Sequence, residues 1–575
     1  MYNARLAEIF EEIANMLELD EEKDRHFEVL AYRKAALTIG TMQEDVGEIY
    51  RKQGVKGLLE IPGVGKSIAG HIKEYVDTGK IAKYEELKKK FPIDFSKLTK
   101  IQGLGAKKIF KLYKALKVKN ADDLKKAIAE HKIRDLEGFG ERSEQELEKN
   151  LGIAAAGGGR LLLGVGLPEA ESMVKALKES GLADRVAIAG STRRMRETVG
   201  DLDILVTSKK PEEMMDFVTK LGNVEGVVLK GPTKTTVRLR IGLTCDVRVV
   251  KPESFGAALQ YFTGNKDHNV KLRTIAIKQG YKLNEYGMFN RKGKNAVGLD
   301  ECDVYKVLGM DCMEPEMRED RGEIELALKH SLPKLVQLSD IKSDLHVHSN
   351  HSDGDSTIAE MAAEASKLGY KYVGMTDHTK AETQARGMDD AKFRKYDNEI
   401  DKFNDSQKKI RVLKSAEIDI LKDGSLDLKD ETLELLDYRI ASVHRNLNMS
   451  TEEMTKRVIA AFETGYVDVF AHPTDRLINE RSGISLDIEK VFDAASRNKV
   501  AMEIDSYPNR LDLSDEHIFI ARRYKLKFTI DTDAHKPQDF GFMRYGIGMA
   551  KRGWLTKNDV LNTLNCDKFL AAIRK

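Results

Sequence analysis

The stretch that decides the fold is Gly190-Ser191-Thr192-Arg193-Arg194, followed from residue 200 by Gly-Asp-Leu-Asp-Ile-Leu-Val. The apolar residues after the second aspartate predict a β-strand, and side chains two apart on a strand point to the same face. Asp201 and Asp203 are therefore expected to share one site. A second strand-like run, residues 244–250, carries Asp246. If the two strands pair, three carboxylates converge, and such charges repel one another unless cations bridge them.

Three converging carboxylates predict a site for Mg²⁺ or Mn²⁺, the two-metal arrangement for in-line attack on a phosphate. Gly190 and Ser191 follow a strand-like run, so a turn there would offer backbone N–H groups and a hydroxyl to a triphosphate. Arg194 would neutralise the triphosphate charge by forked contacts. An Asp-x-Asp pair alone also fits an ordinary turn or a solvated face. Its combination with Gly-Ser, Arg194, Gly200 and Asp246 favours a nucleotidyltransferase.

Composition limits the class of protein. A chain of 575 residues is expected to form several domains. Charged residues make up 33% of it, yet the formal net charge is only +2, so a surface that binds nucleic acid must be local. No signal-peptide pattern and no membrane-spanning apolar run are found, so a cytoplasmic protein without a membrane partner is expected. Scattered cysteines without a C-x-x-C pair favour a reducing compartment and argue against a disulfide framework or thiolate zinc: Cys245, Cys302, Cys312 and Cys566.

The N-terminal third repeats a glycine motif between amphipathic stretches, at residues 61–66, at 101–108 and, more weakly, at 136–141. Its glycines permit a tight turn, and the amides that open the next helix can face a phosphate. Eight lysines and no acidic residue lie between Lys97 and Lys119. The motif resembles the helix-hairpin-helix element, which holds the DNA backbone without reading bases, although a solvated helix face would also be lysine-rich. The acidic third copy is expected to be structural. The expected DNA contacts are Gly63, Gly65, Lys66, Gly103, Gly105, Lys107, Lys108 and Lys111.

The C-terminal third contains seven strand-like runs that alternate with helical patterns, and each run ends in polar residues. Such βα units can close as a barrel, with ligands at the C-terminal strand ends. Nine nitrogen and oxygen ligands exceed one metal site and predict two or three Zn²⁺ or Mn²⁺ ions. A lone buried histidine is usually a core residue, but histidines that end successive strands are not. The expected ligands are His346, His348, Asp353, His378, Glu417, His444, His472, Asp533 and His535.

Taken together, the motifs resemble those of the family X DNA polymerases, in the long bacterial and archaeal form with a C-terminal polymerase and histidinol phosphatase (PHP) domain. The family's G-S-x-x-R and G-D-x-D match residues 190–203, its Y-F-T-G matches residues 261–264, and all nine PHP ligand positions are filled. The resemblance implies that Asp201, Asp203 and Asp246 are catalytic. It implies nucleotide contacts from Gly190, Ser191, Arg194, Gly200, Tyr261, Phe262, Gly264, Asn269 and Arg273. It also implies a PHP phosphoesterase that acts as a 3′-to-5′ exonuclease.

The implied fold class is multidomain: a helical helix-hairpin-helix N-terminal region, an α+β nucleotidyltransferase palm with a helical thumb, and a C-terminal (βα)7 PHP barrel. The expected function is the filling of short gaps in DNA repair, on gapped or primer–template DNA with deoxynucleoside triphosphates, by a monomer. The expected boundaries are 1–90 for the DNA-end-binding domain with the first hairpin, 91–154 for the fingers with the second, 155–251 for the palm, 252–317 for the thumb, 318–338 for a linker and 339–575 for the PHP domain.

One position departs from the family pattern. Members with deoxyribose-phosphate lyase activity carry a Schiff-base lysine six residues after the last glycine of the first hairpin, where this chain has His71. A neutral imidazole cannot form the imine, so lyase activity is not expected.

Two alternative functions stay open. An RNA-tailing nucleotidyltransferase shares Gly-Ser and Asp-x-Asp, but the tandem hairpins and the Y-F-T-G segment count against it. A DNA-end-binding scaffold with little catalysis is the other, and the complete carboxylate triad and PHP ligand set count against that.

Overall fold

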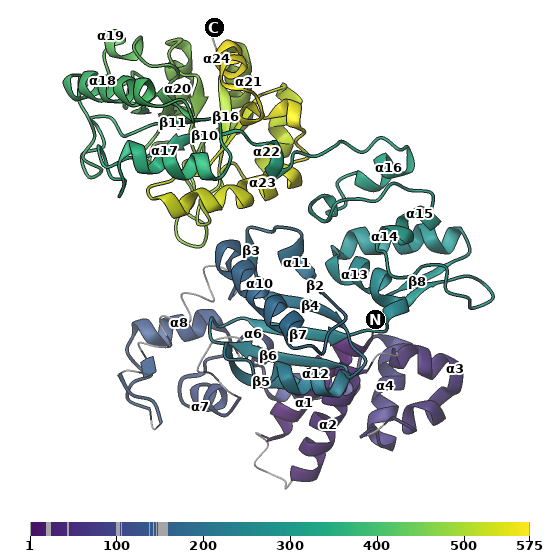
Figure 1. Cartoon of the computed structure of the whole chain (residues 1–575). Coiled ribbons are helices and arrows are strands. Elements are labelled where there is room, and N and C mark those ends of the chain that lie inside the picture. The colour runs from purple at the N-terminus through teal and green to yellow at the C-terminus, as the bar shows by residue number, and fades with distance from the viewer. Residues whose placement is uncertain are drawn as a thin grey trace. The chain divides into compact units, whose positions relative to one another are not determined.

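The computed structural model describes residues 2–18, 25–42, 45–61, 63–98, 104, 106–136, 138–141, 143–144, 147 and 159–573 (Figure 1). The chain divides into two compact units. The first comprises residues 1–161, 169–188 and 200–255, and the second comprises residues 162–168, 189–199 and 256–575.

The N-terminal region is helical and has its own hydrophobic core, formed by residues such as Phe10, Tyr32, Ile72 and Leu112. Gly79 ends α4 in the left-handed conformation that favours glycine (φ 75°). The helices are α1 (Asn3–Glu18), α2 (His26–Thr41), α3 (Val46–Leu59), α4 (Lys66–Thr78), α5 (Ala82–Lys90), α6 (Phe95–Leu98), α7 (Ala106–Leu116) and α8 (Ala121–Ala129).

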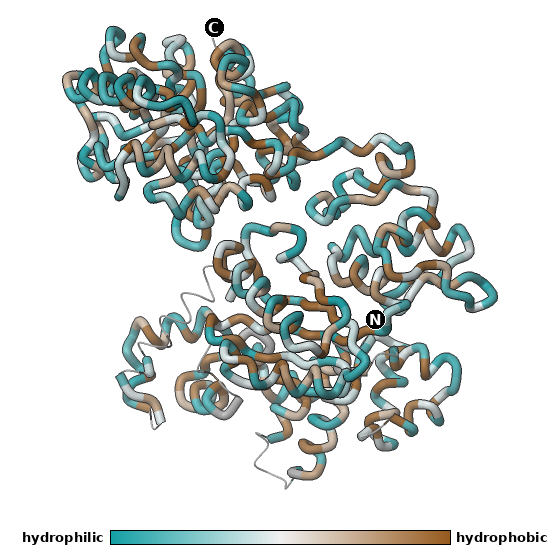
Figure 2. The backbone as a smooth tube through the Cα atoms, viewed as in Figure 1, coloured by the Kyte–Doolittle hydropathy of each residue, from teal (hydrophilic) through white to brown (hydrophobic). Residues whose placement is uncertain are grey.

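The palm is built on a five-stranded sheet of order β2-β4-β7-β6-β5, in which β4 and β7 are parallel and the other pairs are antiparallel. Burial alternates along β6 and β7, so one face of the sheet forms the core. Figure 2 shows hydrophobic segments along the central strands. The elements are β1 (Leu161–Leu162), α10 (Leu163–Glu179), β2 (Arg185–Ile188), α11 (Gly190–Arg193), β3 (Thr198–Val199), β4 (Asp201–Thr207), α12 (Pro211–Val218), β5 (Val224–Lys230), β6 (Lys234–Leu239), β7 (Thr244–Val249) and η1 (Pro252–Ser254).

The thumb combines helices with a short hairpin, β8–β9. The segment 318–338, expected as a linker, begins at the buried Arg318 and contains α16, whose Ile324 and Ala327 belong to the thumb's hydrophobic cluster. The first half of that segment is therefore folded with the thumb. The elements are α13 (Phe255–Thr263), α14 (Lys266–Lys278), β8 (Lys282–Asn284), β9 (Gly287–Phe289), α15 (Cys302–Val307), η2 (Pro315–Met317), α16 (Glu323–Leu328) and η3 (Leu338–Asp340).

The thumb also holds a disulfide, between Cys302 and Cys312. The sequence was predicted to lack a disulfide framework, and that prediction did not anticipate this single bridge. Cys302 begins α15, and the chain turns back after that helix through Gly309 (φ 73°), which brings the two Cα atoms to 5.1 Å. The lack of a C-x-x-C pair could not exclude a bridge that closes a longer loop. Cys245 and Cys566 are free thiols.

The PHP domain is a set of parallel strands in sequence order, β10-β11-β12 and β13 to β17. The segments β12 and β13 lie two residues apart, and parallel bridges join His378 to Glu417 and Val347 to Ala534. The pairing therefore runs from β17 back to β10, which makes a ring of seven parallel strands when β12 and β13 are counted as one, with helices between the strands. The carboxyl ends of all these strands meet at one edge of the ring.

The PHP strands are β10 (Ser343–Val347), β11 (Tyr372–Met375), β12 (Arg411–Lys414), β13 (Glu417–Asp419), β14 (Ile440–Ser442), β15 (Val469–Phe470), β16 (Ala501–Asp505) and β17 (Phe528–Asp531). Its α-helices are α17 (Ile358–Lys367), α18 (Asp390–Ser406), α19 (Asp430–Leu433), α20 (Thr451–Glu463), α21 (Ile488–Asn498), α22 (Asp515–Ala521), α23 (Met543–Arg552) and α24 (Cys566–Ile573). Its 3-10 helices are η4 (Arg522–Tyr524), η5 (Pro537–Phe542), η6 (Lys557–Asp559) and η7 (Leu561–Thr563).

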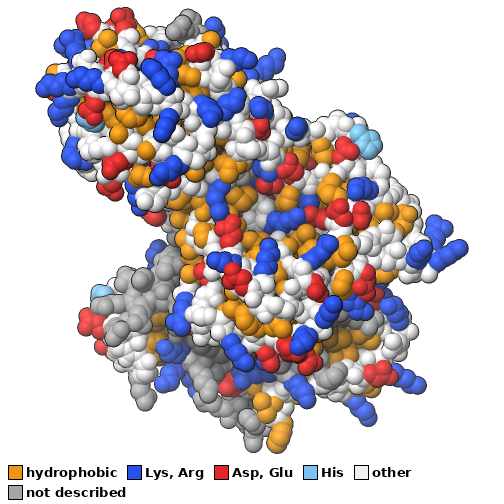
Figure 3. Space-filling view, in the orientation of Figure 1, with side chains coloured by type: hydrophobic (Ala, Val, Ile, Leu, Met, Phe, Trp, Pro, Cys, Tyr) orange, Lys and Arg blue, Asp and Glu red, His pale blue; other side chains and the backbone are white. Residues whose placement is uncertain are grey.

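Surface charge is mixed in sign. Figure 3 shows Lys and Arg side chains interspersed with Asp and Glu on the face drawn, in line with the small net charge of the chain. No helix among the described residues is long and apolar enough to span a bilayer.

Candidate active sites

The palm carboxylates lie on two neighbouring parallel strands. In the register of β4 and β7, Asp203 is the partner of Asp246, and Asp201 is the partner of Thr244. Asp201 and Asp203 are two apart on β4, as the sequence predicts. The groups of metal-competent side chains found in the described part of the chain, with ligand atoms within 4.8 Å of one another, all lie in the PHP domain. The three palm aspartates therefore lie on one face of two inner strands, but their oxygen atoms do not all come within 4.8 Å of one another.

The electrostatics of the palm carboxylates are uneven. Burial, followed by the negative charges of Asp201 and Asp246, raises the pKa of Asp203 to about 7. Burial also opposes the ionisation of Asp246, but the charges of Lys234 and Arg248 outweigh it and lower the pKa of that carboxyl.

Three neighbours of Asp246 were missed by the sequence reasoning. Lys234 Nζ lies 3.0 Å from Asp246 Oδ2, Arg248 Nη2 donates to the same oxygen at 3.3 Å, and the Thr236 hydroxyl donates to Oδ1. Lys234 and Thr236 come from β6, so only the strand pairing brings them here.

The turn after β2 belongs to the second unit, with the thumb and PHP domain. Gly190 and Ser191 begin α11, where Gly190 is buried with φ 65°. Arg194 donates from Nε to Glu319 Oε1 at 3.0 Å and from Nη1 to the carbonyl of Thr263. A Cβ on Gly264 (φ 71°) would lie 3.2 Å from Arg194 Nη1. The G-S-x-x-R and Y-F-T-G motifs therefore meet at Arg194, and glycine at 264 is required by its conformation and favoured by the close contact.

The remaining nucleotide candidates take part in packing as well. The rings of Tyr261 and Phe262 are half-buried and meet edge to face, with centroids 5.1 Å apart. Asn269 is buried and donates to the Tyr261 carbonyl at 2.7 Å, so its amide holds the Y-F-T-G segment. Arg273 Nε donates to the Asn269 carbonyl one helical turn earlier. In the first unit, a Cβ on Gly200 would lie 3.0 Å from Arg160 Nη1.

The candidate DNA contacts divide between described and undescribed residues. Gly63 has φ 87°, Gly65 precedes α4 in an extended conformation, and Lys66 begins α4 with an exposed side chain. Gly103 and Gly105 lie outside the described residues, and so does the side chain of Lys107. Lys108 and Lys111 are exposed on α7, as expected of a phosphate-binding face.

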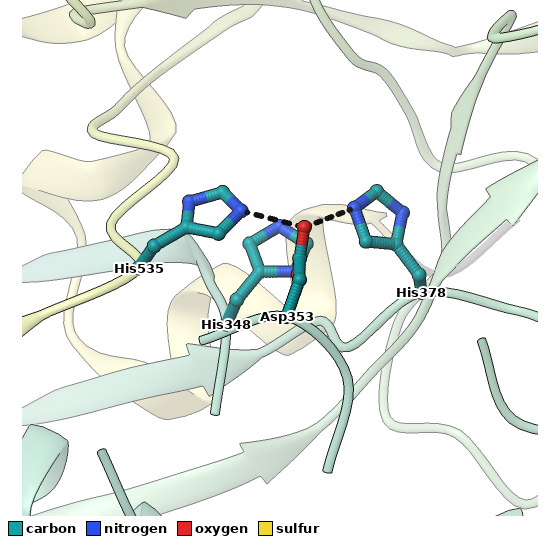
Figure 4. A group of neighbouring side chains, drawn as sticks. All are labelled: His348, Asp353, His378 and His535. Carbon is teal, nitrogen blue, oxygen red and sulfur yellow. Dashed lines mark ion pairs between the residues drawn. The ribbon is translucent and has the colours of Figure 1, made fainter. Parts of the chain in front are cut away.

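The nine PHP candidates come together at the carboxyl edge of the strand ring. Figure 4 shows His348, Asp353, His378 and His535 converging, and Asp353 Oδ2 lies 3.2 Å from His535 Nε2 and 3.5 Å from His378 Nε2. Two further groups are His346 with His348 and Asp533, and His378 with Glu417 and His444. The ninth candidate, His472, lies with its Nε2 2.8 Å from Glu417 Oε1.

The PHP cluster fits metal ions by its unused ligand atoms. Among the residues that the structure describes, the buried ring nitrogens His346 Nε2, His348 Nε2 and His472 Nδ1 and the oxygen Asp533 Oδ1 have no hydrogen-bond partner, although Asp533 Oδ1 lies 3.0 Å from His348 Nε2. Buried polar atoms are nearly always satisfied, and unpaired ones at a His and carboxylate cluster are the donor set of a transition-metal site. Burial opposes the ionisation of Glu417, but the surrounding histidines outweigh it and lower the pKa of that carboxyl, which favours its anionic form.

A buried carboxylate that contacts two of the candidate residues was not predicted from the sequence. Glu503, fully buried on β16, accepts a hydrogen bond from His346 Nδ1 at 2.6 Å and one from the His472 backbone N–H at 2.6 Å. It therefore fixes the His346 ring with Nε2 free for a metal, as outer-shell carboxylates do. Glu382 and Asp419 also lie with His444 in one group of possible ligands. The only sequence signal for Glu503 was its place on a strand of the ring.

Known families and proteins match most of the chain. Family models match residues 1–81 (helix-hairpin-helix domain), 95–147 (SAM-like helix-hairpin-helix tandem), 258–319 (DNA polymerase beta thumb) and 344–506 (PHP domain). The DNA polymerase/3′-5′ exonuclease PolX of Bacillus subtilis (strain 168) is 36% identical over 565 residues, which are 98% of this chain and 97% of that one.

Two partial relatives match different parts. A probable phosphatase of Thermoanaerobacter sp. (strain X514) is 31% identical over 231 residues, 38% of this chain and 89% of that protein. DNA polymerase lambda of Arabidopsis thaliana is 25% identical over 351 residues, 55% of this chain and 62% of that protein.

The fold and its sites define a nucleotidyltransferase palm and thumb joined to helix-hairpin-helix elements and a PHP phosphoesterase domain. With a relative 36% identical over nearly the whole length of both proteins, the chain belongs to the family X DNA polymerases that carry a PHP domain. The multidomain layout predicted from the sequence is confirmed.

Proposed function

We propose that this protein fills short gaps in DNA by nucleotidyl transfer at Asp201, Asp203 and Asp246, and removes 3′-terminal nucleotides with its PHP domain. The observation that carries the proposal is the presence of two separate, complete constellations: carboxylates on paired palm strands and nine His, Asp and Glu ligands at the strand ends of the PHP ring. Neither set is explained as ordinary packing, because Asp203 and Asp246 are half-buried partners and the PHP set gathers charge in a largely buried place.

In the palm, the three aspartates would hold Mg²⁺ or Mn²⁺, which when bound supplies the charge that favours attack by the primer 3′ hydroxyl and departure of pyrophosphate. Arg194 would bind the triphosphate beside Gly190 and Ser191. Its hydrogen bonds to Glu319 and to the Thr263 carbonyl would hold the guanidinium in place for that contact. Tyr261, Phe262 and Gly264 would face the sugar of the incoming nucleotide. Gly200, Asn269 and Arg273 would support these groups.

In the PHP domain, the nine ligands would hold two or three Zn²⁺ or Mn²⁺ ions, which when bound activate water for hydrolysis of a 3′-terminal phosphodiester. Glu503 keeps the His346 ring in place, and the burial of His346 and His348 excludes bulk water from the inner side of the site.

Binding of gapped or primer–template DNA is assigned to the hairpin glycines and the lysines of α4 and α7. These contacts go to phosphates, so they would be independent of sequence and sensitive to salt. Lys66, Lys108 and Lys111 are exposed, as such contacts require.

The test is a primer-extension assay on gapped DNA with two variants. Asp246→Ala should abolish nucleotide addition and leave 3′ trimming intact, whereas His346→Ala with His348→Ala should do the reverse. Loss of both activities in either variant, with the fold intact, would contradict two independent sites. Preference for ribonucleotides on unpaired RNA ends would favour the RNA-tailing alternative, and the absence of both activities in the unaltered protein would favour the scaffold.

A further inference from the structure

A buried ion-pair chain links the Arg194 turn to the PHP domain. Arg552, the last residue of α23, is 1% exposed. Its Nη1 donates to Glu319 Oε1 at 2.8 Å and to the carbonyl oxygen of Arg194 at 2.9 Å. The same Glu319 oxygen accepts from Arg194 Nε at 3.0 Å. Arg552 of the PHP domain therefore binds both the backbone carbonyl of Arg194 and Glu319, the carboxylate that pairs with the Arg194 side chain.

The turn contacts the PHP domain at two further points. A Cβ on Gly548, one turn before Arg552 on α23, would lie 2.8 Å from Met195 Cε, so the bare glycine lets the helix lie against Met195. Arg476 Nη2 lies 2.7 Å from Glu197 Oε2, two residues along the chain from Met195. Residues 194–197 are therefore held by the PHP domain through backbone, apolar and ionic contacts.

The network alternates arginines with carboxylates. Asp515 accepts from Arg552 Nη2 at 2.8 Å and pairs with Arg321 Nη2 at 3.0 Å. Burial opposes the ionisation of Glu319, but Arg552 and Arg194 outweigh it and lower its pKa to about 2. The guanidinium groups of Arg194 and Arg552 thus share Glu319, and Arg552 and Arg321 share Asp515, with Glu516 Oε1 a further 3.9 Å from Arg321 Nη2.

Arg194 is fixed along one edge of its guanidinium. Nε is bonded to Glu319 and Nη1 to the Thr263 carbonyl, whereas no group in the described part of the chain bonds Nη2. A largely buried guanidinium that is held along one edge is preorganised for a phosphate, because little side-chain freedom remains to be given up on binding.

We propose that Arg552 is a positioning residue for nucleotidyl transfer, which acts through Glu319 and the Arg194 carbonyl to hold Arg194 for the triphosphate of the incoming nucleotide. This inference rests on the proposed role of Arg194 in binding that triphosphate. It makes the PHP domain part of the polymerase scaffold as well as a hydrolase. The PHP ligands themselves take no part in it.

The test is a double-mutant cycle in the full-length protein, with KM for deoxynucleotide and kcat measured on gapped DNA for Arg194→Met, Arg552→Met and both together. Arg552→Met should raise KM about tenfold with a smaller change in kcat, as expected when an outer-shell partner is removed. The double variant should be no worse than Arg194→Met alone, because both changes remove one interaction. Exonuclease turnover of Arg552→Met should equal that of the unaltered protein. Arg497→Met, on the surface of α21, is the matched control and should change none of these values.

Glu319→Gln keeps the side-chain volume and provides a second variant in case Arg552→Met does not fold. It should raise KM in the same way, again without effect beyond that of Arg194→Met. An unchanged KM, strictly additive effects in the cycle, or an equal fall in exonuclease and polymerase activity would overturn the positioning role. If Arg194→Met itself leaves KM unchanged, the assigned role of Arg194 fails. If Arg194→Met raises KM and Arg552→Met does not, only the positioning role fails.

Discussion

Asp203 and Asp246 are direct partners in the parallel pairing of β4 and β7. Two carboxylates in that relation cannot both ionise cheaply, because each disfavours the charge of the other. Burial and these neighbouring charges raise the pKa of Asp203 to about 7 from an ordinary value of 3.8. The metal-free palm therefore carries an electrostatic cost that a bound cation would remove.

We expect Asp203→Asn to stabilise the metal-free palm at about pH 8. A raised folded pKa means that stability is greatest at low pH and falls as the pH rises from the unfolded value through about 7. Removing the charge should therefore gain about 1–3 kcal/mol at about pH 8 and little near pH 4. Hydrogen exchange of the β4 and β7 amides measures this locally, which avoids treating a multidomain chain as two-state.

Excess Mg²⁺ should slow exchange of these amides in the unaltered protein and have less effect in Asp203→Asn. Asp216→Asn, which changes an exposed palm carboxylate on α12, serves as the control and should respond to Mg²⁺ as the unaltered protein does. Faster exchange in Asp203→Asn than in the unaltered protein at about pH 8 without metal would show that the buried charge of Asp203 does not destabilise these strands.

Glu503→Gln should weaken the PHP site without touching the polymerase. The carboxylate accepts two hydrogen bonds, from His346 Nδ1 and from the His472 N–H. An amide offers one acceptor, so one of these donors would face an N–H₂ group. We expect metal affinity and exonuclease activity to fall by about 10–100-fold. Metal titration of exonuclease activity, beside primer extension on the same preparation, measures both.

Asp493→Asn on the exposed face of α21 controls for a change of charge in the same domain. If Glu503→Gln kept full exonuclease activity at limiting metal, the hydrogen bond from His346 to Glu503 would not be needed to orient the His346 ring.

Local patterns predicted the parts of the sites that lie on single elements. Asp201 and Asp203 share β4, and the PHP candidate residues follow strands whose parallel order runs in sequence, so a period of two and a repeat of βα units predict that each set lies together. Asp246 joins these two aspartates only if β7 pairs with β4, and the structure has this pairing.

Contacts across long sequence separations could not be predicted in this way. Glu503 supports His346 across 157 residues, and Arg552 reaches Glu319 across 233. No local period marks such residues, because their side chains are defined by the neighbours that the tertiary fold supplies. The Cys302–Cys312 bridge was missed for a related reason, since a turn after α15 decides whether the two thiols meet.

Neutralising the α7 lysines should weaken DNA binding uniformly. Lys108 and Lys111 are exposed, and with Lys107 they lie on the helix after the second hairpin. Lys107→Gln, Lys108→Gln and Lys111→Gln together should lower affinity for all sequences alike and reduce the log–log salt slope by about 0.9 for each phosphate that the protein no longer neutralises. The same three-charge change at Lys88, Lys89 and Lys90 on α5 is the matched control for net charge. A weakening that depends on DNA sequence, or an equal weakening in the control, would count against α7 as the contact face.

The first hairpin should show little deoxyribose-phosphate lyase activity. An imine requires an unprotonated amine at the sugar aldehyde, and the family position holds His71 on α4. Its side chain is only 18% exposed, its ring stacks on Tyr32 with centroids 6.1 Å apart, and burial lowers its pKa, so it is a packed neutral imidazole. Lys73, two residues along the helix, is turned by about 200° and faces elsewhere.

Borohydride trapping on a 5′-deoxyribose-phosphate substrate tests this expectation, with His71→Lys as the gain-of-function comparison. The unaltered protein should trap only at background level, because Lys66, which opens α4 with an exposed side chain, is placed to hold phosphate. Trapping in the His71→Lys variant but not in the unaltered protein would show that the first hairpin binds the sugar and lacks only the nucleophile. Efficient trapping in the unaltered protein that disappears in Lys66→Ala or Lys73→Ala would prove the inference from His71 wrong, and would show that the nucleophile has moved along the helix.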